Sequence, residues 1–222
     1  YTAVKDDCSA FMARMDALTL QYLPLDKEAR KVFYYELRQQ HAFDYQKWST
    51  TDEAATLYFL MKTGFNGIWQ INKNTDGRFG TPSGLLNQKD KVYDKDNVLE
   101  WEKALQHCTL MVGDFRETLS AATPNSYVFL DPPYRGSFTQ YGVDFDDGLQ
   151  ESVIKFLNDL TVKGAYVMMS NRDIGDGFFE ARQSRNDITY FDVTYTAGRR
   201  KKNEDGTHSA KKAREILMIG KK

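Results

Sequence analysis

The sequence predicts an α/β fold in which a Rossmann-like sheet follows a helical and loop-rich region. Two short apolar runs, at 127–130 and 165–169, flank an amphipathic stretch at 149–160, and this order of strand, helix and strand indicates a right-handed parallel crossover. Residues 6–63 instead space their apolar side chains three and four apart, whereas 64–97 carry glycines among polar residues. With 41% hydrophobic and 14% aromatic residues, the 222-residue chain has enough apolar material to build a core.

Three helices are expected in the amino-terminal half. The apolar side chains of 6–20 recur at helical spacing, and that helix should end before the Leu23–Pro24 pair. A second helix is predicted over 27–41 and a third over 52–63. The glycine-bearing stretch 64–97 then predicts a loop-rich insertion.

The carboxyl-terminal half is expected to form the sheet. Residues 188–196 and 214–219 are two further strand candidates, which we expect to pair in antiparallel fashion around the basic loop 198–212. From Cys108 onward the sequence consists of short apolar runs, each followed by a polar or glycine-bearing loop. This change divides the chain into a helical and loop-rich region, 1–107, and a sheet core, 108–222. We find no internal repeat or low-complexity tract.

Charge and cysteine content narrow the class of protein. Lysine and arginine number 30 against 31 aspartates and glutamates, so the net charge of −1 neither indicates nor excludes a polyanionic partner. Residues 198–222, however, carry nine basic and three acidic side chains, a local charge of +6. Two cysteines cannot form a disulfide framework, and no apolar run approaches the ~18 residues of a membrane span. A reduced, soluble, cytoplasmic protein is therefore expected, and because the chain opens with Tyr1 rather than Met, we expect it to be internal to a longer gene product.

The chemistry is expected directly after the first strand, because ligands of parallel sheets bind beyond the carboxyl ends of the strands. The tetrapeptide Asp131, Pro132, Pro133 and Tyr134 stands at that place. Two consecutive prolines fix two φ angles and remove two backbone donors, which leaves rigid carbonyl acceptors beside a carboxylate. Such acceptors suit an exocyclic amine, whose two hydrogens need two partners. The alternative is an ordinary turn that ends a strand.

The tetrapeptide resembles the signature of the Dam-type DNA N6-adenine methyltransferases (D12 class, alpha group). Other stretches are similar to that family in the same order along nearly all of the chain. They are Phe33 to Arg38, Gly64 to Asn72, Gly77 to Gly84, and Ser170–Asn171. The resemblance implies a methyltransferase sheet over 108–222 and a DNA-recognition region with a hairpin over 1–107, in a bacterial or phage-encoded protein.

The resemblance also implies site residues. Asp131 and the Pro132 carbonyl would hold the amino group of an adenine flipped out of duplex DNA, and Tyr134 would stack on that base. S-adenosylmethionine would donate the methyl group by direct in-line transfer. Cofactor contacts are implied at Asp114, Phe115 and Asp131, although Gly113 to Phe115 also fits an exposed turn with one buried aromatic. No metal is expected, since the three histidines show no ligand spacing.

The implied DNA contacts lie in the hairpin and in the basic loop. Phe65 and Asn66 would lie beside the target base, Pro82 would touch a thymine methyl, and Arg78 would hold phosphate. Gln70, two positions after Ile68, stands where the family has an arginine. Because arginine forms two hydrogen bonds to guanine whereas glutamine pairs best with adenine, a target other than the family's usual GATC is expected. Phosphate contacts are also expected at a basic run, and solvation is the alternative for it: Arg199, Arg200, Lys201 and Lys202.

One part of the family pattern is absent from the sequence. The Phe-x-Gly-x-Gly turn and the following acidic residue, which form half of the cofactor site, occur nowhere in the chain. Either a segment outside this sequence or a second chain completes the cofactor site, or the protein is a DNA-binding relic or partner subunit without catalysis. RNA, protein glutamine and cytosine N4 are alternative methyl acceptors, but Asp131 at the first motif position and the hairpin favour DNA adenine.

Overall fold

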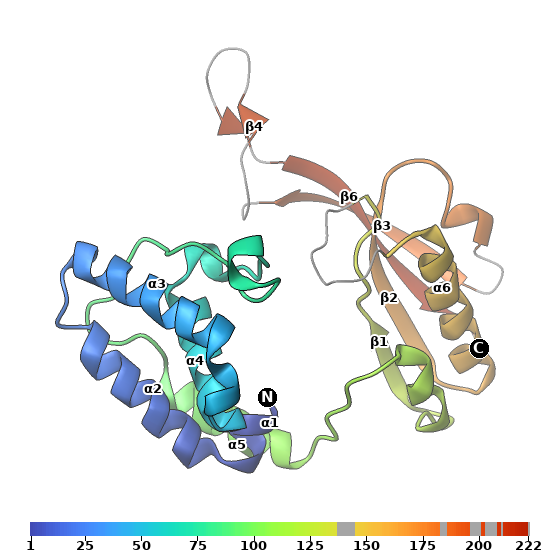
Figure 1. Cartoon of the computed structure of the whole chain (residues 1–222). Coiled ribbons are helices and arrows are strands. Elements are labelled where there is room, and N and C mark those ends of the chain that lie inside the picture. The colour runs from blue at the N-terminus through green and yellow to red at the C-terminus, as the bar shows by residue number, and fades with distance from the viewer. Residues whose placement is uncertain (137–144, 183–185, 196–200, 203–207, 210, 222) are drawn as a thin grey trace. The chain divides into compact units, whose positions relative to one another are not determined.

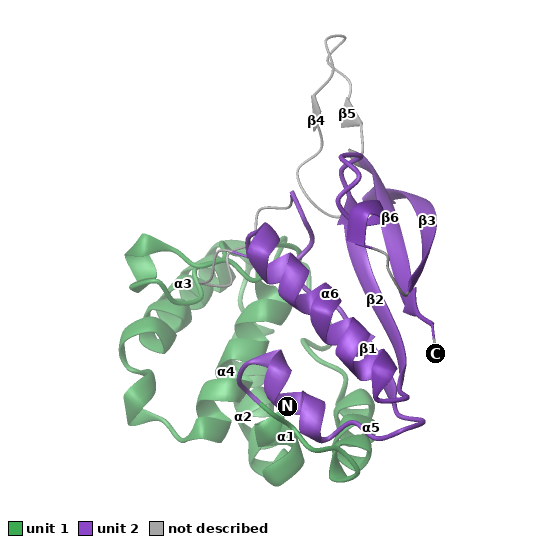
Figure 2. Cartoon of the chain, turned by 90° about the vertical axis from the view of Figure 1, so that its right-hand side faces the viewer, with its two compact units in different colours: residues 1–111 green, residues 112–222 purple. Residues whose placement is uncertain are grey.

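The computed structural model shows two compact units, 1–111 and 112–222 (Figure 2). It describes all residues except 137–144, 183–185, 196–200, 203–207, 210 and 222. The division lies four residues after the expected boundary at 107 and 108. Each unit has its own hydrophobic core, so each is considered by itself.

Unit 1 is a group of helices (Figure 1), most of which begin at a polar capping residue. The three predicted helices are present as α2 (Cys8–Tyr22), α3 (Lys27–Phe43) and α4 (Thr50–Thr63). The side chains of Asp7, Asp26 and Ser49 accept hydrogen bonds from the first turns of these helices, which satisfies backbone donors that have no partner within the helix. Two further helices, α1 (Thr2–Asp6) and α5 (Lys95–Gln106), complete the group. One short 3₁₀ turn, η1 (Tyr45–Lys47), follows α3. Two more follow α4: η2 (Phe65–Gly67) and η3 (Lys73–Thr75).

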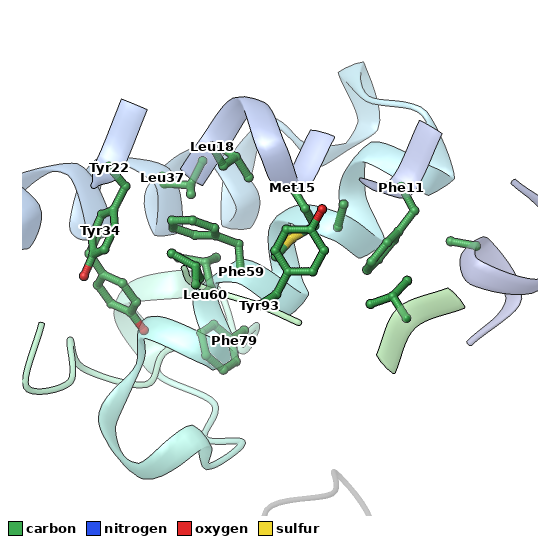
Figure 3. Packing of buried hydrophobic residues seen from close by; sticks show 14 of the residues in the cluster. Phe11, Met15, Leu18, Tyr22, Tyr34, Leu37, Phe59, Leu60, Phe79 and Tyr93 are labelled. Carbon is green, nitrogen blue, oxygen red and sulfur yellow. The ribbon is translucent and has the colours of Figure 1, made fainter. Parts of the chain in front are cut away.

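Aromatic side chains dominate the core of unit 1 (Figure 3). The Tyr22 and Phe59 rings pack edge to face with centroids 5.4 Å apart, and both side chains are fully buried. Phe79, from the loop-rich stretch, is also fully buried in this core. Since burial of one such side chain contributes roughly 1.5–3 kcal/mol, Phe79 anchors the insertion on the helices.

Unit 2 contains a four-stranded mixed sheet in the order β1-β2-β6-β3. The strands are β1 (Tyr127–Leu130), β2 (Tyr166–Asp173), β3 (Asn186–Tyr195) and β6 (Lys211–Gly220), with α6 (Asp147–Val162) between the first two. Strands β1 and β2 are parallel, and β6 runs antiparallel to both of its neighbours. The predicted strand, helix and strand order and the predicted antiparallel pair are both confirmed. Smaller elements are η4 (Phe115–Ser120), η5 (Glu180–Arg182), β4 (Lys201–Lys202) and β5 (His208–Ser209).

The two faces of the sheet differ in unit 2. Helix α6 packs along one face (Figure 1). Its Leu157 and Leu160 meet Val167 and Met169 in the core. The opposite face carries aromatic side chains that are exposed. Tyr127 is 79% and Phe129 60% exposed, and the Tyr127 ring stacks on Tyr166 with centroids 5.1 Å apart. Strand β1 lies at the edge of the described sheet, so its outer side has no strand partner among the described residues.

A buried histidine makes unit 1 sensitive to acid. His41 of α3 is 3% exposed, and neither ring nitrogen has a hydrogen-bond partner within the described part of the chain. Burial, together with the positive charge of Arg78, lowers the pKa of His41 to about 4. The neutral imidazole is therefore the form that fits the folded unit.

We predict that His41→Phe flattens the acid side of the stability profile. The folded-state pKa of His41 lies below its unfolded value of about 6.5, so its contribution is complete above that pH and is lost as the pH falls towards 4. Between pH 7 and 4.5 the unchanged chain should lose about 2–3 kcal/mol more unfolding free energy than the variant. Urea unfolding at the two pH values measures the difference, and equal losses would contradict the prediction.

Candidate active site

The predicted tetrapeptide leaves the carboxyl end of β1 beside β2. The parallel register pairs Leu130 with Met169, so the next residues, Asp131 and Ser170, are neighbours across the strands. The Ser170 hydroxyl donates a hydrogen bond to Asp131 Oδ1 at 2.6 Å. Asp131 is exposed, whereas Pro132, Pro133 and Tyr134 are half-buried. The structure thus brings together two motifs, the tetrapeptide and Ser170–Asn171, that stand 39 residues apart in the sequence.

A relay of two buried amides holds the backbone of this loop. Arg135 N donates to Asn171 Oδ1 at 3.0 Å, Asn171 Nδ2 donates to Gln150 Oε1 at 2.8 Å, and Gln150 Nε2 donates to the Pro133 carbonyl at 2.6 Å. Both amide side chains are fully buried. Because the relay begins at a backbone donor and ends at a backbone acceptor, only one orientation of each amide satisfies every bond.

The relay decides which carbonyl of the loop can accept a ligand. The Pro133 carbonyl is turned inward and is bonded to Gln150. No described residue donates to the Pro132 carbonyl. An exposed carboxylate at Asp131 and a carbonyl at Pro132 are therefore the acceptors that the described residues leave available.

An arginine that the sequence analysis did not single out anchors the end of the loop. Arg135 is 7% exposed and makes paired hydrogen bonds to Asp147 at 2.8 Å and to Asp176 at 3.0 Å. Its guanidinium also lies 3.8 Å from the centre of the Phe178 ring. Hydrogen bonding to Asp147 and Asp176 raises the pKa of Arg135, and hydrogen bonding to Arg135 lowers the pKa of each carboxylate. The charged cluster joins the loop to the start of α6 and to the segment after β2.

The predicted cofactor contacts Asp114 and Phe115 have partners inside unit 2. Asp114 caps η4 and accepts hydrogen bonds from Arg116 N, Nε and Nη2 at 2.9, 2.8 and 2.5 Å. These bonds from Arg116 lower the pKa of Asp114 to about 2. The Phe115 ring packs edge to face on Phe156 with centroids 5.2 Å apart. Contact of these two residues with a cofactor stays a prediction.

The predicted recognition hairpin forms in unit 1. Isolated bridges pair Gly64 with Ser83 and Ile71 with Phe79. At the turn that enters the hairpin, Asn66 and Gly67 adopt φ values of 52° and 62°. Such left-handed values favour asparagine and glycine, which explains this dipeptide.

Helix α3 fixes the second arm of the hairpin. The Tyr34 hydroxyl donates to the Thr81 carbonyl at 2.9 Å, and Arg38 Nη1 donates to the Gly80 and Thr81 carbonyls at 3.0 Å each. Both residues belong to the stretch Phe33 to Arg38, so two parts of the family resemblance contact each other. The hairpin backbone is held by buried donors while its outer side chains stay exposed.

The predicted DNA contacts of the hairpin lie on its accessible side. Phe65 and Ile68 are 46% and 40% exposed, and Asn66 and Pro82 are also exposed. Gln70 is half-exposed, and its backbone carbonyl accepts from Gly80 N at 2.6 Å.

The predicted phosphate contacts are described only in part. The Arg78 guanidinium lies 3.5 Å from the centre of the Tyr45 ring. Arg199 and Arg200 lie outside the described residues. Lys201 and Lys202 form β4, which pairs with β5, but their side chains also lie outside the described part.

Among the described residues, no group of three histidine, cysteine, aspartate or glutamate side chains is placed to hold a metal ion. No helix in the described part of the chain is long and apolar enough to span a membrane.

We predict that Gln150→Leu destabilises unit 2. The change leaves the Pro133 carbonyl and Asn171 Nδ2 buried without partners, at a cost of about 1–3 kcal/mol for each group. Asn158→Leu on the same helix removes one half-buried hydrogen bond from Asn186 and should cost only about 1 kcal/mol. Denaturant unfolding of both variants compares the two costs. Similar losses of unfolding free energy in the two variants would contradict the prediction that the buried relay stabilises unit 2 more than an ordinary hydrogen bond does.

Comparison with known proteins gives the family. A model of the D12 class N6 adenine-specific DNA methyltransferases matches residues 1–197. The type II methyltransferase M.MjaIII of Methanocaldococcus jannaschii is 33% identical over 177 residues, which are 77% of this chain and 60% of that protein. The retron Ec67 DNA adenine methylase of Escherichia coli is 30% identical over 78% of this chain and 57% of its own length.

A DNA adenine methylase of Vibrio cholerae is 31% identical over 65% of this chain and 52% of its own length. The chain thus spans between about half and 60% of these relatives. The four-stranded mixed sheet with α6 on one face agrees with the fold of S-adenosylmethionine-dependent methyltransferases. Sequence, fold and the placing of the Asp-Pro-Pro-Tyr loop together show that the chain belongs to the D12 class N6 adenine-specific DNA methyltransferase family.

Proposed function

We propose that the chain is the recognition and catalytic part of a site-specific DNA adenine N6-methyltransferase. The observation that carries this proposal is the loop after β1, in which Asp131 is exposed and the Pro133 carbonyl is turned inward to Gln150. That arrangement presents one carboxylate and the Pro132 carbonyl to a ligand. Both are acceptors, and an exocyclic amine supplies the two hydrogens that match them.

The chemistry follows from holding the adenine amino group between these acceptors. Hydrogen bonds from the amine to Asp131 and to the Pro132 carbonyl orient the nitrogen lone pair and increase its electron density. Tyr134, half-buried at the end of the tetrapeptide, supplies an aromatic face for the extruded base. S-adenosylmethionine, when bound, supplies an electrophilic methyl group. Positioning of the amine is then the main contribution of this loop.

The described residues fit only part of a cofactor site. Asp131 is accessible, but the carboxylate of Asp114 is bonded to Arg116 and no Phe-x-Gly-x-Gly turn is present in the sequence. The exposed aromatic face at Tyr127 and Phe129, and the outer edge of β1, form a surface that a further strand and helix would cover. We propose that residues outside this sequence, in the same or a second chain, cover it and complete the cofactor site.

DNA recognition is assigned to the hairpin. Exposed Phe65, Asn66 and Ile68 lie at the turn that enters it, and Gln70 directly precedes Ile71, which bridges to Phe79. Arg78, with the basic residues 199–202, would hold phosphates, which positions the protein without reading sequence. Double-stranded DNA is therefore the proposed substrate.

The proposal predicts methyl transfer that depends on Asp131. Transfer of labelled methyl from S-adenosylmethionine to unmethylated duplex DNA is measured for this chain together with the residues that complete the cofactor site, and for the same protein with Asp131→Ala. We expect the variant to lose about 10²-fold or more of the activity, the size of effect seen when one transition-state hydrogen bond is removed. Its affinity for duplexes that lack the target adenine should be unchanged, because phosphate and hairpin contacts remain. Binding without transfer by the completed but otherwise unchanged protein would favour the alternative of a non-catalytic partner subunit.

We predict that the side chain at position 70 determines which base the hairpin prefers. Glutamine pairs best with adenine, whereas arginine forks onto guanine. Gln70→Arg should shift binding towards duplexes with guanine at the contacted position by about 5- to 100-fold, from roughly 1–3 kcal/mol of discrimination. Selection of bound duplexes from a random pool measures the shift, with Lys73→Arg as a control at an exposed position of the same hairpin. An unchanged selected sequence would exclude Gln70 from base recognition.

A further inference from the structure

Ser170 occupies a defined place beside the carboxylate of the loop. It lies in β2, where it pairs with Leu217 of β6, so its backbone is fixed on that side by the sheet. The parallel register brings it next to Asp131, one residue beyond the pair Leu130 and Met169. Its hydroxyl donates to Asp131 Oδ1 at 2.6 Å, a short distance that is typical of a hydroxyl bonded to a carboxylate.

The bond leaves one oxygen of Asp131 for a ligand. Within the described part of the chain, Asp131 forms no ion pair, and Ser170 supplies its hydrogen bond. An exposed carboxylate without a fixed partner can rotate about its terminal bond, because such torsions have broad energy wells. Here the Ser170 hydroxyl, on the central strand β2, donates a hydrogen bond to Asp131 Oδ1. Asp131 Oδ2 remains available to a ligand at the end of the sheet.

The same face of β2 contains no other donor aimed at this carboxylate in the described structure. Met168 lies on the same face two residues before Ser170, and Arg172 lies two residues after it. Arg172 Nη1 donates to the Gly136 carbonyl at 3.3 Å. Asn171, on the opposite face, is committed to the amide relay.

We propose that Ser170 is a positioning residue that fixes the rotation of the Asp131 carboxylate, so that Oδ2 meets the exocyclic amine of the extruded adenine. This inference rests on the proposed function, because it assumes that Asp131 accepts from that amine. Ser170 does not touch the base; it acts through Asp131. Its loss should therefore weaken recognition of the amine while leaving the binding of the surrounding duplex intact.

The test measures recognition of the amine without a cofactor. Two duplexes carry the preferred site selected from a random pool, with an abasic site opposite the target so that the target base is already unpaired. One has adenine at the target and the other has purine, which lacks the amino group. The unchanged chain should bind the adenine duplex about tenfold more tightly, as expected for a hydrogen bond to a charged acceptor.

Three variants separate the hydroxyl from the rest of the side chain. Ser170→Ala should reduce the adenine-to-purine affinity ratio to about 1–3. Ser170→Thr keeps a hydroxyl on a residue suited to a strand and should retain most of the preference. Ser152→Ala, which removes an exposed hydroxyl bonded to the Gly148 carbonyl of α6, serves as the matched control and should leave the ratio unchanged. Thermal unfolding verifies that all variants are folded.

Each outcome supports or overturns the inference. If the unchanged chain binds both duplexes equally, the amine is not recognised, and the proposed function fails together with the role of Ser170. If the unchanged chain prefers adenine and Ser170→Ala retains that preference, only the inference about Ser170 is overturned. A Ser170→Thr variant as impaired as Ser170→Ala would also overturn it, since the hydroxyl would not account for the effect.

Discussion

The loop from Asp131 to Arg135 depends on the parallel pairing of β1 with β2. This pairing covers only four residues of β1, from Tyr127 to Leu130, yet it determines which side chains of β2 meet the loop. Val128 and Leu130 face α6 together with Val167 and Met169, so the buried face of the sheet fixes the register. A slip by one residue would turn those side chains outward and would bring Asp131 opposite a residue other than Ser170.

With that register, the loop after β1 can adopt few other backbone conformations in which its buried polar groups still have hydrogen-bond partners. Prolines at 132 and 133 contribute no backbone donors, and the Arg135 N–H is bonded to Asn171. The Pro133 carbonyl is bonded to Gln150, whose own oxygen is bonded to Asn171. Every buried polar atom in this chain of bonds has a partner, and a different loop conformation would leave several of them without one. The Asp131 carboxylate and the Pro132 carbonyl are thus held in place before any ligand arrives.

The sequence was sufficient to predict α2, α3, α4, α6, the four main strands and the loop, but not α5 or the groups that support the loop. Strand-length apolar runs and the tetrapeptide are local signals, and the structure has the expected strands and α6 at those places. Gln150 gives no such signal, because a polar residue in an amphipathic helix usually faces water. Arg135 and Asp176 are 41 residues apart, so their ion pair is visible only in three dimensions. Helix α5 was not predicted, because it buries only Val98 and Leu105 and lies in a mostly polar stretch.

The two units use the same means to hold functional side chains. In unit 1 the donors Tyr34 and Arg38 bond to the Gly80 and Thr81 carbonyls, as Gln150 bonds to Pro133 in unit 2. The anchoring groups contact backbone atoms, so they do not depend on which side chains the hairpin displays. Gln70 contributes only its carbonyl to the hairpin pairing, a bond that any residue can make. Under the proposed function, a change at this position can therefore alter the base preference without loss of the hairpin, which explains physically how glutamine can stand in a hairpin whose family resemblance implies arginine.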